Sequence, residues 1–188
     1  MAAWPTNDDL TVVIAGWPYA EFEANKKDIE GNFLKTYDLV PSFAERLRAG
    51  TRETRFVGTA VPNFFRKPYG PGWALVGDAG YFKDPLTTHG MTDALRDAEL
   101  LADQILETLT GVLPEAVALA RYQAKRDQLS ARLFEATEAV ASYAWGIDQV
   151  RTLLRQVSSA MSDEVDHLRV LPDRRPALAG LEALRCDG

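Results

Sequence analysis

The chain has 188 residues, of which 46% are hydrophobic and 26% are charged, so its composition is that of a globular protein rather than a disordered one. Its 27 acidic residues outnumber its 21 basic residues. The net charge of −6 argues against a general nucleic-acid binder and against a polybasic membrane-surface protein, because both need a basic face. The single cysteine rules out an intrachain disulfide and a thiolate metal site, and the two histidines argue against a histidine-rich metal site, so we expect no metal.

The N-terminal residues have neither the basic region nor the apolar region of a signal peptide. The longest apolar run, residues 10–17, is too short to span a bilayer. These features predict a soluble, cytoplasmic protein with no membrane partner.

The first part of the chain is predicted to mix strands and helices. Residues 10–17 are apolar and β-branched, which predicts a strand covered on both faces and preceded by a turn. Apolar spacing predicts a helix over residues 21–37, and Pro41 suits the first turn of a shorter helix that ends near Gly50. A second strand is expected over residues 51–61.

The most informative segment is Gly72-Trp73-Ala74-Leu75-Val76-Gly77-Asp78-Ala79-Gly80. Its apolar residues 73–76 predict a buried strand. Asp78 follows at the end of this strand, where a carboxylate can accept hydrogen bonds from ligand hydroxyls. Gly77 has no Cβ, so a ligand can approach the backbone there.

A loop containing Asp84 and Pro85 leads into a long helix that is predicted over residues 90–110, with Thr87 or Thr88 as its cap. The first amides of this helix carry about half a positive charge and suit a group that becomes anionic. We expect its charged residues, among them Asp93, Arg96 and Asp97, to face solvent. The opposite side is an apolar stripe formed by Met91, Ala94, Leu95, Ala98, Ala102, Ile105 and Leu109.

The carboxylate suits a polyol and the helix end suits a developing anion, and a flavin offers both a ribityl chain and a ring edge that becomes negative on reduction. The pattern resembles the C-terminal flavin motif of FAD-dependent monooxygenases of the p-hydroxybenzoate hydroxylase-like group, which is related to geranylgeranyl reductases and flavin halogenases. The resemblance covers residues 4–143 and is most specific over residues 64–106. The motif residues are residues 73–79, Asp84-Pro85, His89-Gly90-Met91, Asp93-Ala94 and Arg96-Asp97-Ala98.

The resemblance implies an oxidoreductase that uses FAD, NAD(P)H and oxygen to hydroxylate a small organic substrate. It implies that Asp78 binds the ribityl chain and that the loop and helix start lie beside the flavin ring. His89 stands where relatives often have a glutamine. Trp17 and Phe64 are candidates for the substrate pocket, and no catalytic acid or base is assigned. The implied cofactor-binding residues are Gly77, Asp78, Pro85, Thr88, His89, Gly90 and Met91.

The same family begins with a GxGxxG turn that holds the ADP half of FAD, and no convincing match to it is present. Gly70-Pro71-Gly72 is the nearest approach, but Leu75 stands at the third glycine position. We therefore expect weak or absent FAD binding in the isolated chain, a tendency to associate, and a possible partner chain that supplies the nucleotide-binding half. Reductase or halogenase chemistry stays open, and the alternative from another class is a truncated, non-enzymatic interaction protein.

Two further helices are predicted over residues 114–143 and 147–161, followed by a charged tail over residues 163–188 with a short helix at residues 178–184. Arg126 is expected to form a structural ion pair while its stem packs. The predicted fold class is α+β, with a partial antiparallel or mixed sheet and long C-terminal helices, corresponding to the substrate-domain and flavin-ring part of a flavoprotein. Three regions are expected: residues 1–71 are substrate-domain-like, residues 72–162 carry the flavin motif and the helices, and residues 163–188 are the tail.

Overall fold

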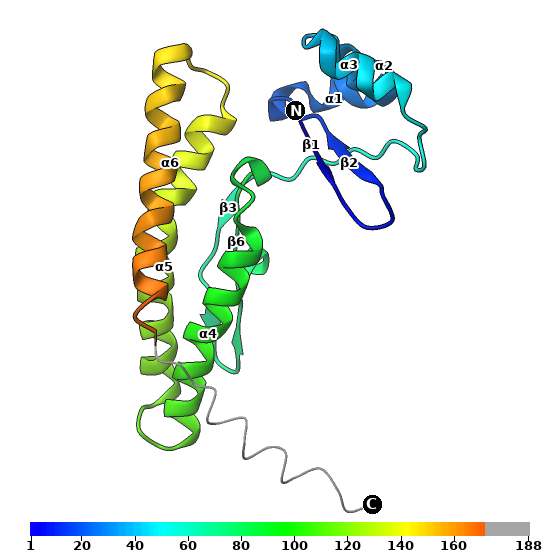
Figure 1. The fold of residues 1–188 in the computed structure, drawn as a ribbon. Helices are drawn as coiled ribbons and strands as arrows, with labels where there is room; N and C mark the ends of the chain where they lie inside the picture. The colour runs from blue at the N-terminus through cyan, green and yellow to red at the C-terminus, as the bar shows by residue number, and fades with distance from the viewer. Residues whose placement is uncertain (172–188) are drawn as a thin grey trace, which may run out of the picture. The chain divides into compact units, whose positions relative to one another are not determined.

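The structure is a computed structural model that describes residues 1–171 (Figure 1). It combines helices with two-stranded antiparallel sheets, so the coarse α+β prediction is confirmed. The described residues form two compact units, Met1–Asn63 with Ala141–Tyr143, and Phe64–Val140 with residues 144–171. The division falls after Asn63 rather than after residue 71, because the strand that begins at Phe64 pairs within the second unit.

The first unit begins with a β-hairpin. Strand β1 (Ala2–Pro5) pairs antiparallel with β2 (Thr11–Ile14). The prediction of a strand over residues 10–17 that is covered on both faces is wrong, since Val12 and Ile14 are exposed. The reason is that β2 pairs only with β1 in the part of the chain that the structure describes.

Short helices follow the hairpin. The helix predicted over residues 21–37 is interrupted by a 3-10 turn at Lys26–Asp28 and divides into α1 (Phe22–Asn25) and α2 (Ile29–Tyr37). The carboxylate of Asp28 accepts a hydrogen bond from the Gly31 amide at 2.9 Å, which caps α2 at its start. Helix α3 (Pro41–Ala49) begins at the proline and ends before Gly50, as predicted.

Aromatic side chains make the core of this unit. The ring of Tyr37 is fully buried and stacks on Phe43, with ring centroids 5.0 Å apart. The strand expected over residues 51–61 does not form; Phe56 instead packs edge-on against Phe33 of α2. Of the apolar residues at the centre of this segment, Phe56 is half-buried and Val57 is 76% exposed, and in the described part of the chain no strand pairs with them.

The second unit contains the remaining short strands. Strand β3 (Phe64–Phe65) pairs with β6 (Tyr81–Phe82), and β4 (Tyr69–Gly70) pairs with β5 (Trp73–Ala74). The buried strand predicted over residues 73–76 is thus shorter than expected, and Trp73 is half exposed. The Leu75 amide donates to the Pro68 carbonyl at 2.7 Å, which holds the chain in place before the Gly-Asp pair.

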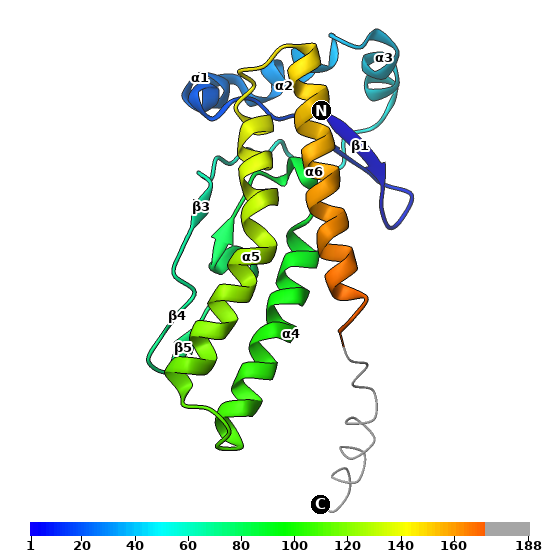
Figure 2. The same cartoon turned by 90° about the vertical axis from the view of Figure 1, so that its left-hand side faces the viewer.

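Three long helices complete the second unit: α4 (Gly90–Leu109), α5 (Glu115–Ala141) and α6 (Ile147–Leu168). They run alongside one another (Figures 1 and 2). Helices α5 and α6 share an apolar cluster of Leu133, Ala136, Val157 and Ala160. Helix α6 continues through residues that were predicted to begin the charged tail; residues 178–184 and Cys186 lie outside the described residues.

Among the described helices, none is both long enough and apolar enough to cross a membrane.

Candidate functional site

Helix α4 turns its charged side inward and its apolar side outward, which is the reverse of the prediction. Arg96 and Asp97 are 2% and 0% exposed, whereas Met91 and Leu95 are 82% and 75% exposed. The amphipathic spacing correctly separates the two faces of the helix. It does not say which face the rest of the fold covers, and here the covering elements bring polar partners.

Arg96 lies at the centre of these partners. Its guanidinium donates to the Asp97 carboxylate and to the Ser130 hydroxyl, each at 2.8 Å, and it forms an ion pair with Glu164. Because its partners come from four elements, this one side chain ties the second unit together. They are Asp93 and Asp97 of α4, Tyr81 of β6, Ser130 of α5 and Glu164 of α6.

Two further buried cations balance the carboxylates. Lys83 forms an ion pair with Asp93, and burial, with the charge of Arg96 adding to it, lowers the pKa of Lys83 to about 8. Arg126 is fully buried, forms an ion pair with Asp127 at 2.6 Å and donates to the Arg66 carbonyl at 2.9 Å. The predicted structural role of Arg126 is therefore confirmed. We call Lys83, Asp93, Arg96, Asp97 and Glu164 the buried charge cluster.

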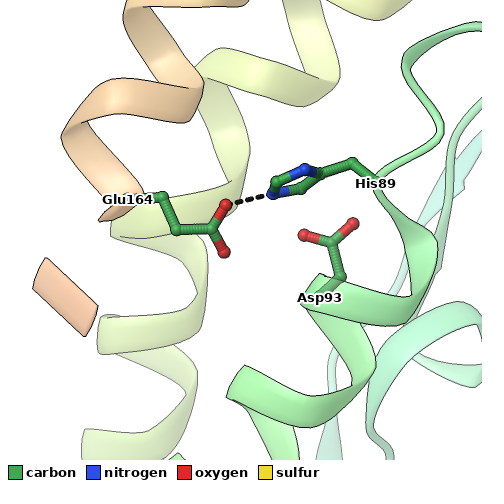
Figure 3. Close-up of side chains that lie close together, drawn as sticks. All are labelled: His89, Asp93 and Glu164. Atoms are coloured by element: carbon green, nitrogen blue, oxygen red, sulfur yellow. Dashed lines mark hydrogen bonds and ion pairs between the residues drawn. The ribbon is translucent and has the colours of Figure 1, made fainter. Parts of the chain in front are cut away.

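At one end of this cluster, His89 joins the start of α4 to α6 (Figure 3). Its Nε2 atom is hydrogen-bonded to the carboxylate of Glu164, and Asp93 lies close by. One ligand atom from each of these three residues falls within 4.8 Å of the others, which is a spacing that a metal ion could use. The donor set does not fit a metal, however, because Lys83 and Arg96 already neutralise the carboxylates and would repel a cation.

The charges in the cluster set the acid sensitivity of the second unit. Burial acts to raise the pKa of Glu164, but the hydrogen bond from His89 and the charge of Arg96 outweigh it, so that this pKa lies below its ordinary value of 4.5. A carboxyl group with a depressed pKa stabilises the fold above its unfolded-state pKa, and this contribution is lost as the pH falls through the folded-state pKa.

We therefore expect the melting temperature of the chain to fall as the pH is lowered below 4.5. The variant Glu164→Gln should melt at a lower temperature at neutral pH and should show a shallower fall in acid, because it has no carboxyl group to protonate. Thermal unfolding followed by circular dichroism checks this. The matched control is Glu135→Gln, at an exposed position of α5, which should retain the full acid dependence. Equal slopes for Glu164→Gln and the parent chain would refute the assignment.

Two of the predicted flavin residues, Gly77 and Asp78, are neighbours in the chain but differ in exposure. Gly77 is buried with a positive φ of 52°, and its amide donates to Asp97 Oδ2 at 3.1 Å. A Cβ at Gly77 would lie 2.8 Å from the Cβ of Ala94, so this glycine is needed for the close approach of α4. Asp78 is exposed, and its Oδ1 lies 3.5 Å from the place that a Cβ on Gly90 would take. The carboxylate thus faces the first residue of α4.

The start of α4 has no side-chain cap. His89 occupies the N-cap position without a capping hydrogen bond, so the expected cap at Thr87 or Thr88 is wrong. The Thr88 hydroxyl instead donates to the Thr87 carbonyl at 2.8 Å. Gly90 and Met91 are both exposed. Their amides are consequently available to a ligand that reaches the positive end of the helix.

The remaining predicted residues are less well placed to contact a flavin or a substrate. Pro85 is exposed in the 3-10 turn Pro85–Thr87, and the His89 side chain is held by Glu164, which leaves only its backbone for a ligand. Trp17 donates to the Thr36 hydroxyl at 3.0 Å within the first unit. Phe64 belongs to the second unit, where Arg66 lies over its ring. Neither unit by itself therefore contains both predicted substrate-pocket residues.

The structure brings Gly77, Asp78, Gly90 and Met91 together, and we call these residues the α4 N-terminal site. The buried charge cluster behind it was not predicted as a unit. Arg96 and Asp97 lie in the predicted helix, but Glu164, the partner of Arg96, lies in a segment that is predicted to be a tail. No local pattern links positions so far apart in the chain.

No protein-family model, no curated protein and no solved structure matches this chain.

Proposed function

We propose that the α4 N-terminal site is the ribityl- and ring-binding part of a flavin site, and that the chain is the C-terminal portion of an FAD-dependent oxidoreductase, a monooxygenase acting on a small organic substrate. The observation that carries the proposal is the exposed Asp78 carboxylate, which faces the uncapped first residue of a 20-residue helix. One place then offers both a hydroxyl acceptor and a set of amide donors.

The chemistry of these groups matches the two polar parts of a flavin. The Asp78 carboxylate can accept hydrogen bonds from ribityl hydroxyls, and charged acceptors make the stronger kind of hydrogen bond. The amides of Gly90 and Met91 can donate to the pyrimidine edge of the ring, where the helix end stabilises negative charge. The bound flavin, reduced by NAD(P)H, would supply the redox chemistry, while the protein orients it.

The contacts on this chain predict how its affinities for riboflavin, FMN and FAD compare. The printed sequence holds no GxGxxG turn, so the ADP half of FAD finds no matching motif here. Riboflavin, FMN and FAD should therefore bind the chain with similar, weak affinities. A separate chain that supplies a dinucleotide-binding motif should strengthen the binding of FAD over riboflavin.

The test is a titration of the chain with riboflavin and with FAD, followed by flavin fluorescence. Replacement Asp78→Ala should weaken both affinities by about 10-fold to 100-fold, because a hydrogen bond to a charged group contributes about 1.5–3 kcal/mol. The matched control is Asp148→Ala, which removes a carboxylate that is 90% exposed on α6 and should change nothing. Absence of riboflavin binding, unchanged affinity in Asp78→Ala, or much tighter binding of FAD than of riboflavin would contradict the proposal.

A second candidate function, that of a non-enzymatic interaction protein, is favoured by the outward-facing apolar side of α4. The two candidates are separated by the same titration. A chain that associates through α4 without binding any flavin would support the second.

A further inference from the structure

The outward face of α4 is apolar along its whole length. The exposed residues of this helix are all glycine, alanine, methionine, leucine or isoleucine, and each charged residue of α4 is buried or half-buried. Leu95 and Leu109 are 75% and 78% exposed. A continuous apolar face of this kind is the mark of a surface that another molecule covers. The centre of this face is a stripe of Met91, Leu95, Ala98, Ala102, Ile105 and Leu109, and Leu106, which is 51% exposed, lies at its edge.

The spacing of the stripe suits a second helix. Successive members are separated alternately by four and three residues, which is the spacing of the apolar positions along the seam between two packed helices. The stripe is also symmetric about position 100, because Met91, Leu95 and Ala98 are matched in reverse order by Leu109, Ile105 and Ala102. An antiparallel copy of α4 would therefore present the same pattern of large and small residues.

We propose that α4 is the contact surface of an antiparallel homodimer of this chain, related by a two-fold axis near position 100. In this register Leu95 meets Ile105 of the partner subunit, and Ala98 meets Ala102 of the partner subunit. The alanines at the centre allow the two helix axes to approach closely. This proposal does not depend on flavin binding.

Charge favours a second copy as the occupant, and the size of the face sets how strongly the two copies associate. The chain carries a net charge of −6, but the exposed face of α4 has no charged residue, so two copies meet there without like-charge contacts. A 20-residue helix is about 30 Å long. One face of that length is smaller than the roughly 800 Å² that each partner buries in a standard interface. The dimer should therefore dissociate on dilution rather than be permanent.

The first test is the oligomeric state of the full chain, measured by sedimentation over a range of concentrations. The parent chain should show a monomer–dimer equilibrium. Leu95→Asp should weaken the dimer at least about 100-fold, because each copy would bury a charge without a partner. The matched control is Ile147→Asp, at an apolar position of α6 that is 66% exposed, which should leave the equilibrium unchanged. Circular dichroism confirms that each variant keeps its helices.

The second test distinguishes the direction of the two helices. In a Cys186→Ser background, chains with Ala98→Cys and chains with Ala102→Cys are oxidised separately and as a mixture. The antiparallel register predicts that the mixture forms disulfide-linked dimers faster than either variant alone. A parent chain that stays monomeric, a dimer that resists Leu95→Asp, or faster linkage within the single variants would each overturn the proposal.

Discussion

Replacement of Arg96 by methionine is expected to lower the free energy of unfolding of the second unit by about 3–5 kcal/mol. Methionine keeps much of the apolar stem but removes the charge. Asp97 and Glu164, which are both almost fully buried, would then lose their main cationic partner. Because small domains are stable by only about 5–15 kcal/mol, this loss is a large share of the stability of the unit. Urea denaturation followed by circular dichroism of helices α4 to α6 measures the change.

The matched control for Arg96→Met is Arg121→Met. The Arg121 side chain is 59% exposed and makes a long ion pair with Glu107 at 3.5 Å. Exposed pairs of this kind contribute at most about 1 kcal/mol, so the control should unfold at nearly the parent urea concentration. Equal losses for the two variants would show that the buried charge cluster is no more important than a surface ion pair.

Helices α3 and α4 were predicted correctly because their sequence signals are local. Helix α4 has a strong apolar period, and helix α3 begins at a proline and ends before a glycine, as those residues favour. The strands over residues 10–17 and 51–61 were predicted less well. An apolar β-branched run predicts a strand, but the number of strands that pair with it depends on residues elsewhere in the chain.

The same limit explains the reversed faces of α4. The period of a helix divides its residues into two sides, and the usual assumption is that the apolar side faces the core. Here Arg96 finds Glu164 on α6 and Ser130 on α5, and neither pairing leaves a trace in the local sequence. Tertiary ion pairs therefore decided an orientation that hydrophobicity alone predicted wrongly.

For the candidate site, the short loop between the Gly-Asp pair and α4 made one prediction possible. Asp78 and Gly90 lie close together in the structure, as the order of strand, carboxylate, loop and helix suggested. The side chain of His89 could not be placed in this way, because its partner Glu164 comes from a distant helix. The role of Gly77 also needed the structure, since the atom that excludes a Cβ belongs to Ala94.

Gly77→Ala should cost about 2–5 kcal/mol of stability, which is more than a glycine in a turn usually costs. Its φ of 52° is a conformation that costs an L residue about 1–2 kcal/mol. The new methyl group would also lie 2.8 Å from the Ala94 side chain, and such overpacking costs a further 1–3 kcal/mol or so. Urea denaturation of the variant measures the sum of the two effects.

Gly72→Ala separates the two contributions to this loss. Gly72 has a positive φ of 75°, but no atom lies within 4 Å of the place that its Cβ would take. This variant should therefore lose only the backbone contribution of about 1–2 kcal/mol. The difference between the two variants is the cost of pushing α4 away from the Gly-Asp turn. If both variants lose the same amount, α4 can shift without cost, and Gly77 is then not what fixes the distance between Asp78 and the start of the helix.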